Sequence, residues 1–135
     1  LCMGGFLAGH DPGYGLLAGD SAEYVGSPGS TVRDNSDALV TVNWGARSRR
    51  VYFQGGPTFH FDTSVRPTVL ARYTNGAPAM AVVSCGRGRV AVSGPHPEAP
   101  VSWYREAGLP IPTPLPTTLG WELVAQLQDR SILSH

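Results

Sequence analysis

The stretch TVLARYTNGAPAMAVVS, residues 68–84, decides the fold class. It predicts a β-hairpin with one strand over Thr68–Tyr73, a turn at Asn75 and Gly76, and a second strand over Pro78–Ser84. Asn-Gly is the strongest short-range hairpin signal, because both central residues of its turn take positive φ. We therefore expect the centre of the chain to be β-sheet.

The segments on either side extend this pattern. Ala38–Trp44 alternates apolar and polar side chains, which is typical of a half-buried strand. GARS, residues 45–48, predicts a turn into a second strand over Arg50–Phe53, which QGGPTF at residues 54–59 then breaks. On the other side, a glycine-flanked turn leads into a strand over Arg89–Gly94. The sequence thus predicts a run of strands joined by tight turns.

Outside this run, the patterns predict loops and short helices. Cys2–Ala8 suits one or two helical turns, whereas residues 11–24 read as a loop and residues 27–37 as an exposed, turn-rich segment. VSWYREAG, residues 101–108, predicts a short helix that ends at a glycine. The prolines of Leu109–Pro116 predict an extended segment, because proline cannot donate a helix hydrogen bond.

The last predicted element is a helix over Leu119–Arg130. Gly120 weakens it by roughly 1 kcal/mol relative to alanine. The sequence divides accordingly into a domain over residues 1–108 and a C-terminal part, residues 109–135, made of the Pro-rich segment and this helix. The apolar residues expected on one helical face, with Glu122, Gln126 and Asp129 turned away, are Leu119, Leu123, Val124 and Leu127.

Composition limits the classes of function. The 135 residues suffice for one domain with a real core. All ten basic residues are arginines and the formal net charge is zero, so no overall charge recruits nucleic acid or an anionic membrane. No stretch reaches the roughly 20 apolar residues of a membrane span, and Leu1–Ala8 lacks the length and basic leader of a signal peptide. The compartment stays open, with the cytoplasm favoured.

Cys2 is the first residue with candidate chemistry. It is followed by Met3 and by the paired Gly4 and Gly5, directly before the first predicted helical turns. Small residues after a nucleophile permit the tight strand-to-helix turn that exposes its side chain, and a helix N-terminus favours the thiolate. The alternative for Cys2, and our interpretation of Cys85, is a small buried apolar residue.

GPHPE, residues 94–98, follows the last predicted strand. Pro97 favours extended geometry at His96, and residues two apart in an extended segment point the same way. Glu98 can therefore lie beside the His96 ring, fix its tautomer and stabilise its imidazolium form, as the orienting residue and base of a catalytic triad do. The alternative is a surface turn with a solvated ion pair.

The segment YFQGGPTFHF, residues 52–61, carries the third candidate feature. Gly55 and Gly56 permit a close backbone approach, either to a ligand or within a tight turn. His60 and Asp62, with a second His-Asp pair at residues 10–11, do not have convincing metal-ligand spacing, so we expect neither a metal nor another cofactor.

These features together resemble the biotin-protein ligase N-terminal-like family, a branch of the class I glutamine amidotransferase superfamily. The resemblance covers most of residues 1–109, and YFQGGP followed by GPHPE is its most specific part. It implies a flavodoxin-like α/β fold, here truncated, with a β-rich hairpin section and a C-terminal helix. The stretches that carry the resemblance are GDSAEYVGSPG, VYFQGGPTF, VLARYTNGAPAMAVVSCGRGRVAVSGPHPE and WYREAGL.

Residue by residue, the resemblance implies a Cys-His-Glu triad. Cys2 stands at the nucleophile position, His96 at the base and Glu98 at the orienting residue. The backbone N–H of Met3 would be one oxyanion-hole donor, because that donor normally comes from the residue after the nucleophile. The implied reaction is acyl transfer, in which the thiolate attacks an amide carbonyl and the thioester is hydrolysed.

The resemblance makes residues 1–108 the C-terminal half of such a domain. The family's N-terminal half, which holds parallel strands and the second oxyanion donor, has no counterpart here, so we expect a preceding segment, a partner or a homo-oligomer to complete the sheet. The chain has no lysine and no glycine-rich phosphate loop with one, so biotin-AMP chemistry is not indicated.

Two classes of function follow. The first is a non-catalytic or regulatory binding domain that keeps the fold and the triad residues, because a shared fold does not establish activity. The alternative is a cysteine-nucleophile amidase or glutaminase that acts through Cys2, His96 and Glu98. In either case the expected ligand is a small-molecule amide or a biotin-related compound, rather than a nucleic acid or a membrane.

Overall fold

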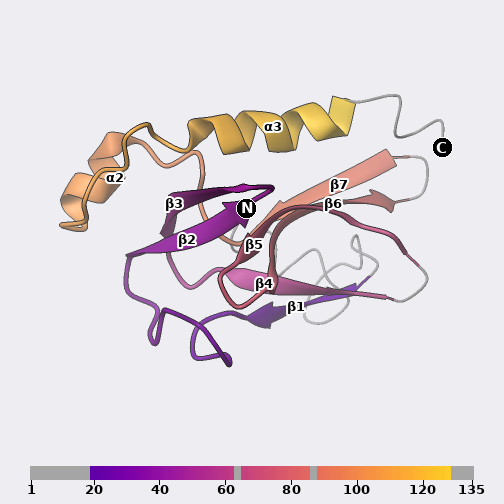
Figure 1. Cartoon of the computed structure of the whole chain (residues 1–135), viewed down its shortest axis with the longest axis horizontal. Coiled ribbons are helices and arrows are strands. Elements are labelled where there is room, and N and C mark those ends of the chain that lie inside the picture. The colour runs from indigo at the N-terminus through magenta and orange to yellow at the C-terminus, as the bar shows by residue number, and fades with distance from the viewer. Residues whose placement is uncertain (1–18, 63–64, 86–87, 129–135) are drawn as a thin grey trace.

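The computed structural model describes residues 19–62, 65–85 and 88–128. In this part of the chain the fold is mixed α/β, with seven strands in two antiparallel sheets and two helices (Figure 1). The strands are β1 (Gly19–Glu23), β2 (Ala38–Trp44), β3 (Arg47–Phe53), β4 (Pro57–Phe61), β5 (Thr68–Tyr73), β6 (Pro78–Cys85) and β7 (Gly88–Ser93). The helices are α2 (Val101–Glu106) and α3 (Thr117–Gln128).

The larger sheet has the strand order β3-β2-β5-β6-β7. Three of its strand pairs, β2–β3, β5–β6 and β6–β7, are neighbours in the sequence, as the turn signals predict. The predicted hairpin over residues 68–84 is confirmed, and the Asn75–Gly76 turn takes φ +87° at its glycine. All described strand pairs are antiparallel, and none shows the parallel pairing expected of a flavodoxin-like sheet. The flavodoxin-like fold is therefore not confirmed and stays a prediction.

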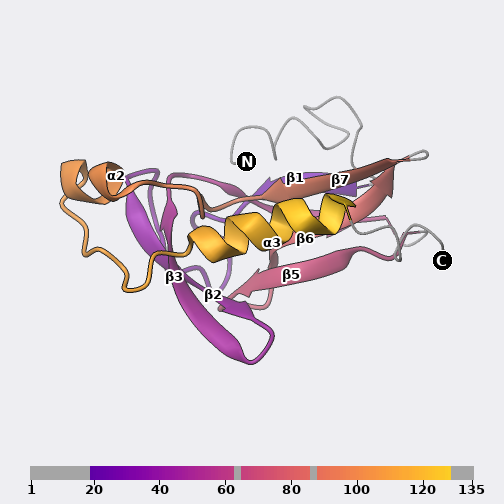
Figure 2. The ribbon, with the colours of Figure 1, turned by 90° about the horizontal axis from the view of Figure 1, so that it is seen from above.

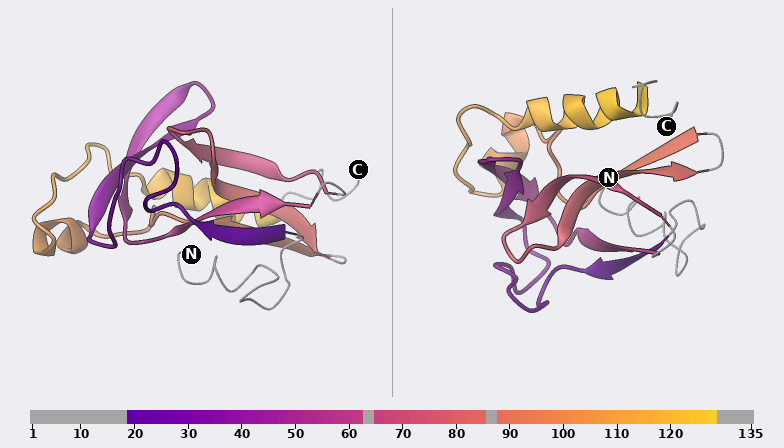
Figure 3. Two further views of the ribbon diagram at one scale, coloured as in Figure 1. Left: turned by 90° about the horizontal axis from the view of Figure 1, so that it is seen from below. Right: turned by 45° about the vertical axis from the view of Figure 1, so that its right-hand side comes forward.

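The smaller sheet corrects two predictions. Residues 19–23 were expected in a loop and residues 57–59 in a strand break, but they form β1 and β4, which pair from Gly19↔Phe61 to Glu23↔Pro57. GDSAE has weak strand propensity of its own, and this pairing is what stabilises it as a strand. The two strands lie side by side on one face of the larger sheet (Figure 3, left).

The β2–β3 hairpin is also tighter than predicted. Its connection is the two-residue turn Gly45–Ala46, where Gly45 has φ +56°, and β3 therefore begins at Arg47 instead of Arg50. Two-residue turns of this kind match the natural twist of antiparallel strands. All of the arginine-rich stretch RSRR, residues 47–50, thus belongs to the strand.

The molecule has three layers. Helix α3 lies on one face of the larger sheet, and the smaller sheet of β1 and β4 lies on the other face (Figures 1 and 2). β6 lies between them and is buried on both sides, which explains its almost continuous apolar sequence. Met80 and Val82 pack in the same cluster as Leu119 and Leu123 of α3. On the opposite face, Ala81 and Val83 of β6 share a cluster with Phe59 of β4 and Val92 of β7.

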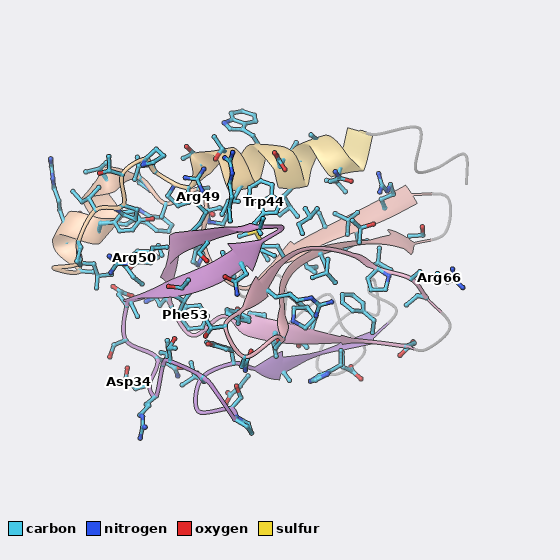
Figure 4. The ribbon with its side chains drawn as sticks, viewed as in Figure 1. Asp34, Trp44, Arg49, Arg50, Phe53 and Arg66 are labelled. Atoms are coloured by element: carbon cyan, nitrogen blue, oxygen red, sulfur yellow. The ribbon has the colours of Figure 1, made fainter. Side chains whose placement is uncertain are left out.

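Stacked aromatic rings join the smaller sheet to the core. The rings of Tyr24 and Tyr73 are stacked with centroids 3.8 Å apart, and Phe53 meets both edge-on. The Tyr73 hydroxyl donates a 2.7 Å hydrogen bond to the carbonyl of Pro57. The start of β4 is therefore fixed to β5 across the interior. Phe53 is labelled in Figure 4.

Both helices lie close to where the sequence predicts them, but the sheet covers only part of the apolar face of α3. α2 ends next to Gly108, which has φ +68°, as predicted. In α3, Leu119 and Leu123 are buried, whereas Val124 is 46% exposed and Leu127 is 38% exposed. Of the four apolar residues predicted on one helical face, the structure therefore buries two. The strip that the sheet covers is narrower than the apolar strip of the helix.

Candidate active site

The predicted contact between His96 and Glu98 is present. His96 Nδ1 lies 2.6 Å from Glu98 Oε1, and the two side chains are 14% and 41% exposed. Because a carboxylate only accepts hydrogen bonds, Nδ1 carries the hydrogen and donates it. In the neutral ring, Nε2 is then the basic nitrogen. This is the tautomer that a general base in a triad uses.

Backbone hydrogen bonds hold the segment that carries this pair. The N–H of Gly94 donates to the carbonyl of Ala79 in β6 over 2.9 Å, and the N–H of His96 donates to the carbonyl of Tyr52 in β3 over 2.8 Å. His96 thereby forms an isolated antiparallel bridge with Tyr52. The segment Gly94–Glu98 spans from β6 to the outer edge of β3, which fixes the backbone of the histidine.

Aromatic rings surround His96. Its ring meets Trp103 of α2 edge-on at a centroid distance of 5.5 Å and Tyr52 at 6.1 Å. Tyr52 in turn packs edge-on against both Trp103 and the fully buried Tyr104. These contacts restrict rotation of the imidazole, because edge-to-face packing depends on ring orientation. The sequence did not single out Trp103, Tyr104 or the Tyr52 ring as site residues, because their contacts join distant segments.

The electrostatics favour an ionised Glu98. Burial by itself would raise the pKa of this carboxyl group, but the hydrogen bond from His96, a backbone hydrogen bond and the charge of His96 outweigh it, so the pKa is lowered. The neighbouring phenols are held neutral. Burial, together with a hydrogen bond to Asp37 and its charge, raises the pKa of Tyr52 to about 12. Burial also raises the pKa of Tyr104.

The two glycines of YFQGGP have structural explanations. Gly55 has φ +59°, a conformation that favours glycine, and a Cβ there would lie 2.9 Å from Asn35 Oδ1. A Cβ on Gly56 would lie 2.7 Å from the carbonyl carbon of Gly94. The two motifs that carry the family resemblance therefore touch each other. Ligand binding by Gly55 and Gly56 stays a prediction.

A groove lies next to Glu98 of the His96–Glu98 pair. It has a volume of about 490 Å³ and lies between β7, the Pro97–Glu98 turn and α3. Its walls are mostly apolar, with Ala91, Val124 and Leu127 among them, and Trp121 is 73% exposed at this surface. Among the described residues that line it, Glu98 is the one with a charged side chain. Pockets of this size and polarity hold small molecules in other proteins.

Several predicted site residues lie outside the described residues. These are Cys2, the predicted nucleophile, Met3, the predicted oxyanion donor, and the His10–Asp11 pair. Cys85 ends β6, and His60 is an exposed residue of β4. Among the residues that the structure describes, no three His, Cys, Asp or Glu side chains gather as a metal site would require. Neither described helix has the length and apolar character to cross a membrane.

His96 and Glu98 thus lie together on a hydrogen-bonded backbone, next to the rings of Tyr52 and Trp103, and Glu98 lines an apolar groove. Comparison with known proteins found no matching family model, no matching curated protein and no matching solved structure.

Proposed function

We propose that this chain is a class I glutamine amidotransferase-like domain, of the biotin-protein ligase N-terminal-like family and with a flavodoxin-like fold, that performs cysteine-dependent acyl transfer on an amide. The observation that carries the proposal is the 2.6 Å contact between His96 Nδ1 and Glu98 Oε1, on a backbone tied to Tyr52. A solvated surface ion pair needs neither the backbone bridge nor the packed rings, so these contacts support a positioned base.

In the proposed reaction, His96 Nε2 takes the proton of the Cys2 thiol as the sulfur attacks the amide carbonyl. The carbonyl π electrons move to the oxygen, which the N–H of Met3 stabilises. The tetrahedral intermediate collapses, the C–N bond breaks, and the imidazolium gives its proton to the leaving amine. Water then attacks the thioester with His96 as base, which releases the acid and the thiol. Glu98 keeps the imidazole in the required tautomer throughout.

A second candidate function is a non-catalytic or regulatory binding domain. The groove beside Glu98 favours it, because most of its wall is apolar and Trp121, Val124 and Leu127 are exposed there. A small amide or a biotin-related ligand with an apolar body suits such a wall. In this case His96 and Glu98 would form a structural pair.

The rate of thiol alkylation distinguishes the two functions. The chain has two cysteines, so a Cys85→Ser background leaves Cys2 as the one thiol. For the enzyme we expect iodoacetamide to react with Cys2 at about pH 7 as fast as a thiolate does, and His96→Ala to slow it at least about tenfold. Glu98→Gln should produce a smaller slowing. His60→Ala and Glu122→Gln are the matched controls, because both residues are exposed and lie outside the pair.

An unreactive Cys2 would contradict the acyl-transfer proposal. If Cys2 titrates near the ordinary thiol pKa of ~8.5 and its alkylation is insensitive to His96→Ala, the acyl-transfer proposal is wrong and the binding domain is favoured. Cys2→Ser in the same background gives the blank for non-specific labelling.

A further inference from the structure

β3 is one edge of the larger sheet, and within the part of the chain that the structure describes no strand lies beside the outer side of its Arg47–Arg50 stretch. Along an antiparallel strand, successive residues turn their backbone polar groups alternately toward the two neighbours. The carbonyl of Tyr52 faces outward, because it accepts the His96 N–H. The backbone groups of Arg50 and Ser48 therefore also face outward, and over residues 19–62, 65–85 and 88–128 they have no backbone hydrogen-bond partner there.

The same edge is strongly basic. Arg47, Arg49 and Arg50 are three of the ten basic residues of a chain whose net charge is zero. Because side chains alternate along a strand, Arg50 shares one face with Ser48, and Arg47 and Arg49 share the other, so both faces carry positive charge. Arg49 and Arg50 are labelled in Figure 4. In the described part of the chain none of the three forms an ion pair, although Glu122 of α3 lines a neighbouring groove with Arg47 and Arg49.

A groove of about 560 Å³ follows this edge. The residues of β3 from Arg47 to Arg50 form one wall, and residues Ile111–Pro114 of the Pro-rich segment form the other. None of the described residues that line it carries a carboxylate. Pro112 and Pro114 have no N–H, so these two residues of the opposite wall cannot donate backbone hydrogen bonds to a bound chain. A chain lying in the groove would meet an open strand edge and unpaired guanidinium groups.

We propose that the outer edge of β3 binds an extended acidic peptide segment of a partner protein, which adds a strand to the sheet. The segment pairs its backbone with Ser48 and Arg50 and sets its carboxylates against Arg47, Arg49 and Arg50. Strand addition is a common mode of peptide recognition, with affinity from main-chain hydrogen bonds and selectivity from side chains. Two residues beyond Arg50 on the same edge, Tyr52 already forms an antiparallel bridge with His96 of this chain. The site does not depend on the proposed acyl transfer.

The open strand edge favours a peptide over a nucleic acid. A nucleic acid can neutralise the arginines, but it has no backbone that continues a β-ladder. Arginine forms two parallel hydrogen bonds with carboxylates and with phosphates alike, so the open strand edge, and not the charge, is what favours the peptide.

The first test uses a fluorescein-labelled peptide of alternating glutamate and threonine and the full chain, with binding followed by fluorescence anisotropy. We expect saturable binding, and no binding of the matched peptide with lysine in place of glutamate. The double variant Arg49→Gln/Arg50→Gln should weaken binding about fivefold or more. Arg105→Gln, an exposed arginine of α2, is the control and should leave binding unchanged.

The second test addresses strand pairing. Ser48→Pro removes an outward N–H that the β2 ladder does not use, and proline is tolerated at such edge positions. We expect at least about tenfold weaker binding than for Ser48→Ala, which also lacks the hydroxyl group but keeps the N–H. If Ser48→Pro does not fold, a peptide N-methylated at alternate amides tests the same bonds on the wild-type chain and should bind at least about tenfold more weakly than the unmodified peptide.

Three results overturn the proposal. One is equal binding of the glutamate and lysine peptides. Another is a single-stranded oligonucleotide that binds with the same arginine dependence while N-methylation of the peptide has no effect, which indicates phosphate recognition. The third is a glutamine double variant that binds normally but aggregates, because the arginines would then serve only to protect an exposed edge.

Discussion

Gly56 and Gly94 are in direct backbone contact, and this contact joins the start of β4 to the segment that carries His96. A Cβ on Gly56 would lie 2.7 Å from the Gly94 carbonyl carbon, and a Cβ on Gly94 would lie 3.2 Å from the carbonyl carbon of Pro57. Neither position therefore has room for a side chain. The close approach places the β3–β4 connection against the loop of the His96–Glu98 pair.

We expect Gly56→Ala to destabilise the protein by about 1–3 kcal/mol, because backbone atoms must move to admit the methyl group. Urea unfolding followed by circular dichroism measures this change. Gly94→Ala should behave likewise, since its Cβ would also overlap the Tyr73 hydroxyl. A free energy of unfolding within about 0.5 kcal/mol of wild type for both variants would contradict the close contact.

Gly120→Ala should have the opposite effect. Gly120 lies within α3 and has no positive φ, and a Cβ there would meet Pro97 at 3.7 Å, an ordinary contact distance. Alanine is favoured over glycine in a helix by about 0.8–1 kcal/mol, so the midpoint of thermal unfolding should rise. A fall in that midpoint would show that α3 is packed more tightly against the Pro97 turn than the structure indicates.

Tyr52 should make stability depend on alkaline pH. Its pKa is raised from 10.0 to about 12, so its stabilising contribution is complete below pH 10 and is lost as the pH rises through 12. Two pKa units correspond to about 2–3 kcal/mol. We expect the free energy of unfolding of the wild type to fall relative to Tyr52→Phe across this window. Parallel pH profiles for the two proteins would show that Tyr52 ionises as an exposed phenol does.

Glu98 should have the corresponding effect in acid. Its pKa is lowered from the ordinary 4.5, so its contribution is complete above that pH and is lost as the pH falls through the folded-state value. NMR titration of its carboxyl resonance should show the lowered pKa, and His96→Ala should return it toward the ordinary range. No change on His96→Ala would mean that the pair does not interact in solution.

Local signals in the sequence were enough for much of the fold. The Asn75–Gly76 turn with its flanking strands and the hairpin from β2 to β3 follow from turn chemistry and alternation over a few residues. The same holds for the contact of His96 with Glu98, because Pro97 and a spacing of two residues bring the side chains together. That part of the candidate site could be predicted from five consecutive residues.

Long-range packing decided the rest. The sequence alone established the hairpins, the two helices and the His96–Glu98 pair, because each depends on neighbours in the chain. Only the tertiary structure decided that β1 pairs with β4, that His96 joins β3 at Tyr52 beside Trp103, and that Val124 and Leu127 of α3 remain exposed. These features depend on which distant surfaces meet, and the hydrogen-bonding and apolar groups involved would fit other partners equally well.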